Sequence, residues 1–229
     1  GALLHSWQQI AENFYPQRAD FTHSRLPGRQ YDLDLMSSYP VLMRRELGDS
    51  ISSMLRPTNK TWFHTRTKRN WKQLGVDGRA WLESAEDTQR RAMLHRESQF
   101  ARAVKEADHD FATFGQAVIQ HNLNQTASGL MFRCHHLRDT AWTENENGVI
   151  DTVFRRWKPT VRDLMRLFPG TIHPRVREKM DKDPFAEIET WHVVLPSYMC
   201  DPTSRFAFVS YYIDPVNQHI MEQVGQYEL

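Results

Sequence analysis

The chain has 229 residues, of which 40% are hydrophobic and 25% are charged, a composition typical of a folded globular protein. Lysine and arginine total 29 against 28 aspartate and glutamate, so the formal charge of +1 gives no general field that would attract nucleic acid. Two cysteines are too few for a disulfide framework or a cysteine zinc cage. No apolar run reaches the ~18 residues of a membrane span. We therefore expect a cytosolic globular protein whose contacts with DNA, if any, are local.

Helical patterns come first along the chain. Apolar residues recur at spacings of three and four in residues 3–14 and again in residues 38–55, where Ser38 is the expected N-cap. Pro16 and Pro57 end these helices. Residues 16–36 have no apolar period and are expected to form an extended arm. The apolar stripe of the second helix consists of Met43, Leu47, Ile51, Met54 and Leu55.

Two further helical faces lie at residues 77–93, with Asp77 as the expected N-cap, and at residues 100–114. They form either one long helix or a pair broken near His95. The pattern then changes to short segments compatible with strands. These are residues 116–123 and 130–137, which are joined by a polar turn, then residues 149–157, 189–195, 206–213 and 219–224. Short helices are expected at residues 160–168, where Thr160 and Asp163 resemble a capping box, and at residues 174–182.

The fold class is therefore α+β, with N-terminal helices and an extended arm followed by a mostly antiparallel sheet with short crossing helices. We expect two regions, residues 1–57 with the helices and arm and residues 58–229 with the α+β domain. Trp157 and Trp191 lie in expected strands and are predicted to be buried anchors of that domain.

Residues 62–72 combine aromatic with cationic side chains, which can hold phosphates while stacking on bases. The structural alternative is that Trp62 and Trp71 anchor the segment to the core while its cations face water. Nucleic-acid or partner contacts would be made by Arg66, Lys68, Arg69 and Lys72.

No residues are nominated for catalysis. The ten glycines form no phosphate-binding loop, and a Gly-x-Ser-x-Gly nucleophile elbow is absent. Cys134, His135 and His136 are consecutive, and consecutive strand residues point to opposite faces, so they do not converge on one metal ion. We therefore expect neither a metal nor a cofactor and no enzymatic activity.

Several segments, in their order and spacing, resemble the portal proteins of short-tailed bacteriophages, which are head-to-tail connectors. The segments are residues 56–63, 81–83, 111–118, 148–157, 167–169 and 188–196. The similarity covers most of residues 1–213 and corresponds to the N-terminal half and wing of such a subunit. The stem and clip of a full-length portal are absent, so the chain is expected to be a fragment of a longer protein.

The resemblance implies a structural subunit in a ring of twelve copies at one capsid vertex, through which DNA is packaged and ejected. Its implied partners are the major capsid protein, the terminase motor, a tail adaptor and the double-stranded DNA that passes through the channel. The implied location is the virion, and the host cytoplasm during assembly. A free-standing nucleic-acid-binding module that uses residues 62–72 is the alternative.

In a ring of this kind, one patch of each subunit contacts a different patch of the next subunit. The arm contains apolar residues without a helical or strand period, so it is expected to pack across a neighbouring subunit. The residues predicted to do so are Phe21, Tyr31, Leu33 and Leu35.

Overall fold

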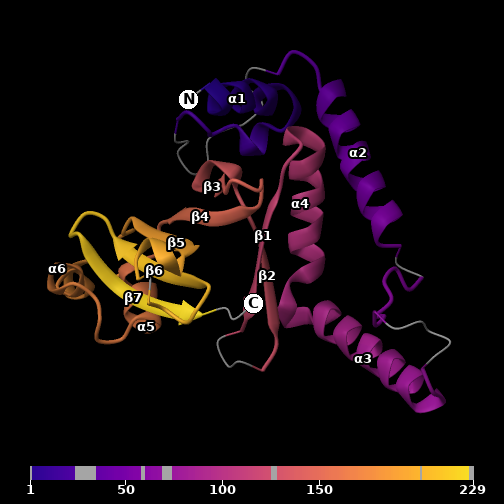
Figure 1. Cartoon of the computed structure of the whole chain (residues 1–229). Coiled ribbons are helices and arrows are strands. Elements are labelled where there is room, and N and C mark those ends of the chain that lie inside the picture. The colour runs from indigo at the N-terminus through magenta and orange to yellow at the C-terminus, as the bar shows by residue number, and fades with distance from the viewer. Residues whose placement is uncertain are drawn as a thin grey trace. The chain divides into compact units, whose positions relative to one another are not determined.

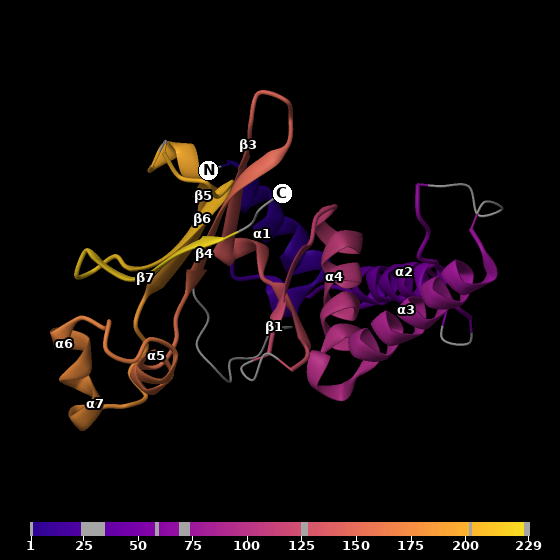
Figure 2. The same cartoon turned by 60° about the horizontal axis from the view of Figure 1, so that its bottom comes forward.

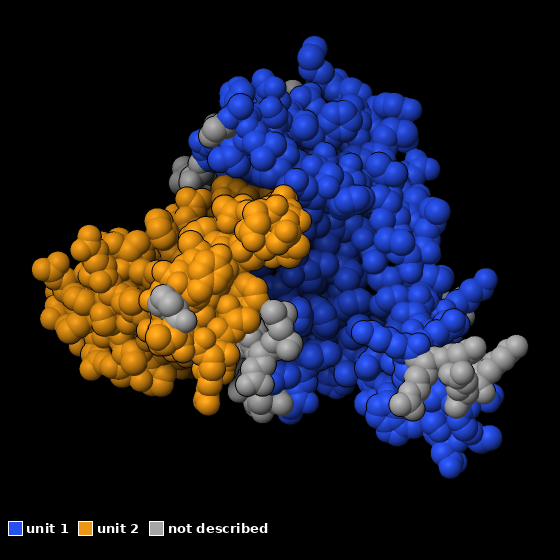
Figure 3. Space-filling model, in the orientation of Figure 1, with its two compact units in different colours: residues 1–136 blue, residues 137–229 orange. Residues whose placement is uncertain are grey.

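The structure is a computed structural model that describes residues 2–23, 35–57, 60–68, 74–124, 128–201 and 203–226 (Figure 1). It confirms the α+β class. The chain forms two compact units, residues 1–136 and 137–229 (Figure 3). This boundary differs from the one expected at residue 57. The helix Tyr39–Leu55 packs against the helix Phe100–Phe114, so both helices belong to the first unit.

The first unit contains four helices and one hairpin among the residues described. The helices agree with the expected ones, and the two patterns near His95 are separate helices, divided by a short 3-10 turn and by Gln99 at φ 56°. The N-cap of the third helix is Gly75, and Asp77 lies in its first turn. The elements are α1 (Ala2–Phe14), α2 (Tyr39–Leu55), α3 (Val76–Leu94), α4 (Phe100–Phe114), β1 (Val118–Leu123) and β2 (Leu130–His135).

An aromatic cluster joins the N-terminal segment to α4 and the end of the hairpin. The ring of Phe21 lies 5.6 Å from Trp7, 5.2 Å from Phe114 and 4.9 Å from His136 between centroids. Only 6% of Phe21 is exposed. Phe21 therefore belongs to the core of its own chain rather than to a surface for a neighbouring subunit. Leu35 is half-buried, whereas Tyr31 and Leu33 lie outside the described residues.

The second unit is an antiparallel sheet in the order β3-β4-β5-β6-β7 with three short helices. Figure 2 shows these helices grouped at one end of the sheet. The sequence indicated every strand except the first, and the single helix expected at residues 174–182 is divided at Glu178. The elements are β3 (Thr140–Glu144), β4 (Ile150–Trp157), α5 (Val161–Leu167), α6 (Pro174–Arg177), α7 (Lys179–Lys182), β5 (Thr190–Pro196), β6 (Phe208–Asp214) and β7 (His219–Gln226).

The core of this unit lies between the sheet and α5. The helix begins where Thr160 Oγ1 accepts a hydrogen bond from the Asp163 backbone N–H at 3.2 Å, which confirms the predicted cap. This start turns Val161 and Leu164 inward, and neither side chain is exposed. Trp157 packs against the same core and remains partly exposed, so it is an anchor at the margin of the core rather than at its centre.

Candidate interaction surfaces

Three consecutive polar residues of α4 are buried, although the helix carries an apolar pattern. Each of them contacts one arginine of the N-terminal segment. Arg18 lies just after α1, Arg44 lies in α2, and Arg56 directly follows α2. The contacts are Asp108 with Arg56, His109 with Arg44, and Asp110 with Arg18. Successive helical residues point 100° apart, so these contacts hold the N-terminal segment around α4 from several sides.

The electrostatics of these contacts are consistent with their burial. Burial lowers the pKa of His109 and the cation of Arg44 lowers it further, so the ring stays neutral and its Nδ1 accepts a hydrogen bond from Arg44 at 3.1 Å. Burial raises the pKa of Asp110, which the Arg18 guanidinium at 3.1 Å opposes. The Cys134 thiol lies 3.6 Å from the same carboxylate. Each buried charge thus has a partner, as burial requires.

The approach of α2 to α4 is close because Gly48 faces the His109 ring. A β-carbon at position 48 would lie 2.8 Å from Cε1 and 3.1 Å from Cγ of that ring, and closer still to Nδ1. Helices approach this closely only where a residue is small. The inward side of α2 therefore consists of Arg44 and Gly48, the two buried residues of the helix.

As a consequence, the apolar stripe of α2 faces solvent. An apolar stripe on a surface helix normally covers the core. Here Tyr39 is 65% exposed, Leu47 is 51% exposed and Met54 is 81% exposed, and Met43 is 40% exposed between them. These four residues, which we name the α2 stripe, lie on one side of the helix at spacings of four, four and seven. Exposed apolar surfaces of this kind mark interaction sites.

A second exposed apolar surface lies on the sheet of the other unit. His192 stacks on Tyr212 at 4.3 Å, and Tyr212 contacts Phe168 of the core, so the neighbouring Trp191 points to the opposite face. Trp191 is 44% exposed and Phe154 is 41% exposed. The prediction that Trp191 is a buried anchor is therefore wrong, because the helices cover only the other face of the sheet.

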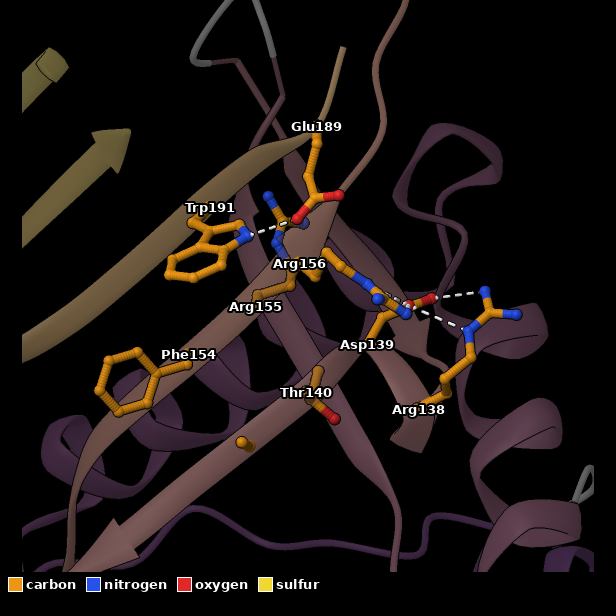
Figure 4. A pocket seen from close by; sticks show the side chains of 9 residues that line it. Arg138, Asp139, Thr140, Phe154, Arg155, Arg156, Glu189 and Trp191 are labelled. Atoms are coloured by element: carbon orange, nitrogen blue, oxygen red, sulfur yellow. Dashed lines mark hydrogen bonds and ion pairs between the residues drawn. The ribbon is translucent and has the colours of Figure 1, made fainter. Parts of the chain in front are cut away.

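Trp191 and Phe154 border a pocket of about 400 Å³, which we name the sheet pocket (Figure 4). Cross-strand pairing sets Arg156 beside Trp191 and Ala141 beside Phe154. The lining residues are Arg138, Asp139, Thr140, Ala141, Phe154, Arg155, Arg156, Glu189 and Trp191.

Charge in the sheet pocket is organised around Asp139. Its carboxylate accepts hydrogen bonds from Arg138 at 3.1 and 2.9 Å and from Arg156 Nη2 at 3.0 Å. Burial alone would raise the pKa of Asp139, but these hydrogen bonds outweigh it and hold the pKa below its ordinary value. Glu189 is likewise engaged, as it accepts from Trp191 Nε1 at 3.0 Å. Three arginines against two carboxylates leave the pocket with an excess of one positive charge.

This arrangement suits binding rather than catalysis. A carboxylate that is held ionised between two arginines is not poised to accept a proton. Exposed tryptophan and arginine side chains with apolar walls are instead the residue types that carry most of the binding energy at protein interfaces.

The basic and aromatic stretch lies near acidic residues. The Trp62 ring stacks on Phe100 at 6.1 Å, which favours the anchoring interpretation for this tryptophan. Arg66 and Lys68 are exposed, while Arg69, Trp71 and Lys72 lie outside the described residues. A groove of about 500 Å³ beside the stretch is lined by Glu83, Glu86 and Asp87 of α3 and also by Arg66 and Arg90. His64 Nδ1 lies 3.2 Å from Glu86. Three carboxylates against two arginines leave the groove with an excess of one negative charge, which disfavours phosphate binding there.

Cys134, His135 and His136 contact three different partners. Cys134 faces Asp110 at 3.6 Å, His135 Nε2 lies 2.7 Å from Gln120, and His136 Nε2 lies 2.8 Å from Asp20. Nowhere in the described part of the chain do three histidine, cysteine or acidic residues gather as metal ligands would.

Among the helices that the structure describes, none is both long and apolar enough to cross a lipid bilayer.

Sequence reasoning missed both exposed surfaces and the arginine contacts of α4. The available signal for the latter was the triplet Asp108-His109-Asp110 inside an otherwise apolar helical pattern, since such a triplet cannot avoid the buried side. The sheet pocket had no comparable signal, because Asp139 and Trp191 are 52 residues apart.

Comparison with known proteins gives one family. A family model described as "Bacteriophage head to tail connecting protein" matches residues 2–229. No curated protein matches the chain. The family match spans both units and so includes α2 and the strands that form the sheet pocket.

Proposed function

The chain belongs to the family of bacteriophage head to tail connecting proteins, and we propose that it is a structural subunit of a portal ring at the capsid vertex, through which DNA is packaged and ejected. Membership makes it a phage connector and a component of the virion. The observation that carries the proposal is the extent of the match, which covers residues 2–229 and therefore both units.

In this role the chain acts by binding other copies of itself and other proteins of the particle. The proposed ring contains twelve copies, as the resemblance to portal proteins implies, and its further partners are the major capsid protein, a tail adaptor and the terminase motor. Exposed apolar surfaces on both units support an assembling protein, since a monomer gains nothing by leaving them in water. Because a separate motor would supply the packaging energy, we propose that this chain holds no catalytic site and no metal or organic cofactor.

The test is assembly together with location. Mass photometry and negative-stain electron microscopy of the purified chain should show closed rings, with twelve-fold symmetry in class averages. Immunogold labelling of phage particles should mark one vertex, where the tail attaches. A chain that stays monomeric at micromolar concentration, together with labelling spread over the capsid or absent from it, would overturn the proposal.

The alternative function is a nucleic-acid-binding module that uses the stretch at residues 62–72. Arg66 and Lys68 are exposed and could reach phosphates, but the acidic groove on α3 opposes this. Binding to double-stranded DNA at increasing salt separates the two functions. A module that neutralises several phosphates loses affinity with a slope of about 0.9 per phosphate on logarithmic axes. We expect weak binding with a shallow slope, whereas a steep slope that Arg66→Ala and Lys68→Ala reduce would favour the module.

A further inference from the structure

Each copy of the chain exposes two apolar surfaces of different shape, a convex helical stripe and a concave pocket. A ring generated by rotation uses two different patches on each subunit, one of which contacts the copy ahead and one the copy behind. We propose, building on the proposed ring, that the α2 stripe of one copy docks on the sheet pocket of the next copy.

The shapes of the two surfaces fit this mode of binding. An amphipathic helix that lies in an apolar groove presents anchors at helical spacing. Tyr39, Met43 and Leu47 follow one another at four-residue intervals along α2 and are all at least 40% exposed. The walls of the pocket, Phe154 and Trp191, are exposed to a similar degree. Both sides therefore remove apolar area from water when they meet, which is the main driving force for association.

The charges of the two surfaces are complementary. The pocket has an excess of one positive charge, and the Arg156 side chain is 42% exposed although it contacts Asp139. Glu46 borders the α2 stripe, and no residue in the described ranges forms an ion pair with it. Its neighbour Asp49 is by contrast engaged by Arg45 and Lys105. When the stripe docks, Glu46 lies near the arginines at the rim of the pocket and can form an ion pair with them.

Docking of the α2 stripe on the sheet pocket accounts for both surfaces, whereas pairing of α2 with the α2 of another copy accounts for only one. Pairing of α2 with α2 is an isologous contact that closes as a dimer and leaves the sheet pocket empty. The head-to-tail contact fills both surfaces of every copy and can continue until a ring closes.

Complementary variants test the inference. Leu47→Arg places a cation on the stripe against the positive pocket, and Trp191→Glu removes one wall of the pocket and adds a charge that repels Glu46. Each variant alone should stay monomeric in mass photometry. An equimolar mixture should give a 1:1 heterodimer, because the intact stripe of Trp191→Glu can dock once on the intact pocket of Leu47→Arg. Glu46→Lys should weaken assembly about twofold to fivefold, as expected for an ion pair near the surface.

Matched controls separate docking from misfolding. Leu94→Arg changes a side chain on α3 that is 57% exposed, and Val216→Glu changes one in the turn before β7 that is 78% exposed, and both should assemble as the wild type does. All of these variants should keep the circular dichroism spectrum of the wild type and unfold in one cooperative transition. The melting temperature of variants that do not assemble should be lower than that of the assembled wild type, because association stabilises the folded chain.

The outcomes are distinct. Rings formed by Leu47→Arg or by Trp191→Glu alone would overturn the docking and leave the connector role intact. Assembly of Trp191→Glu into dimers that Leu47→Arg cannot form would show pairing of α2 with itself and would also overturn it. A wild-type chain that remains monomeric would overturn both the ring and the docking.

Discussion

Replacement of Gly48 by alanine tests the arrangement that turns the α2 stripe outward. The added β-carbon would enter the His109 ring, with 2.8 Å to Cε1 and 3.1 Å to Cγ. The ring cannot easily move aside, because Arg44 lies 3.1 Å from Nδ1 and Asp49 lies 3.5 Å from Nε2. Either the two helices must separate or His109 must lose its partners.

The expected magnitude follows from opposing effects. Alanine in a helix interior is favoured over glycine by about 1 kcal/mol. Overpacking costs about 1–3 kcal/mol, and loss of the hydrogen bond between Arg44 and His109 costs about 1.5–3 kcal/mol. Because the unfavourable effects are larger, we expect Gly48→Ala to lower the free energy of unfolding by about 2–4 kcal/mol.

Urea unfolding, followed by circular dichroism at 222 nm, measures this change. Gly78→Ala is the matched control, since its β-carbon would meet only Leu74 at 3.4 and 3.9 Å, which is ordinary contact. The control should be neutral or stabilising by up to about 1 kcal/mol. If Gly48→Ala were as stable as Gly78→Ala, the close packing of α2 on α4 would be refuted.

Three further predictions concern single side chains. Trp157→Ala should cost about 2–4 kcal/mol in urea unfolding because the ring packs on a core, while Trp191→Ala should cost about 1 kcal/mol or less, and equal costs would contradict their placement. Burial, together with a nearby carboxylate, raises the pKa of the Cys134 thiol to about 12, so a thiol reagent at neutral pH should modify the exposed Cys200 quickly and Cys134 only after unfolding. The pKa of Asp139 is held low in the folded state, so its ion pairs stabilise the protein above the ordinary carboxyl pKa of about 4, and this stabilisation is lost as the pH falls through the lower folded value. The stability difference between the wild type and Asp139→Asn should therefore shrink on acidification, and a constant difference would argue against these ion pairs.

Local patterns predicted the secondary structure well because they depend on residues a few positions apart. The cap of α5 needs only Thr160 and the backbone N–H of Asp163. The hairpin of β1 and β2 follows from two short apolar segments around a polar turn. These features are largely independent of the rest of the chain.

Which face of a helix or strand is buried depends on residues that are distant in the sequence. The apolar stripe of α2 indicated a helix correctly, yet Arg44 and Gly48 face inward because their partner His109 lies more than 60 residues later. Trp191 is a large aromatic residue in a strand, a type that is usually buried, but the short helices cover the other face of its sheet.

Sequence patterns were therefore sufficient to identify the α+β class, the order of most helices and strands, and the family to which the chain belongs. Only the tertiary structure decided which apolar residues remain in water, because burial depends on partners that chain folding brings together from distant positions. The α2 stripe and the sheet pocket arise in this way. The first is an apolar pattern along one helix, whereas the second is assembled from residues far apart in the sequence, and on both the apolar side chains remain exposed in the part of the chain that the structure describes.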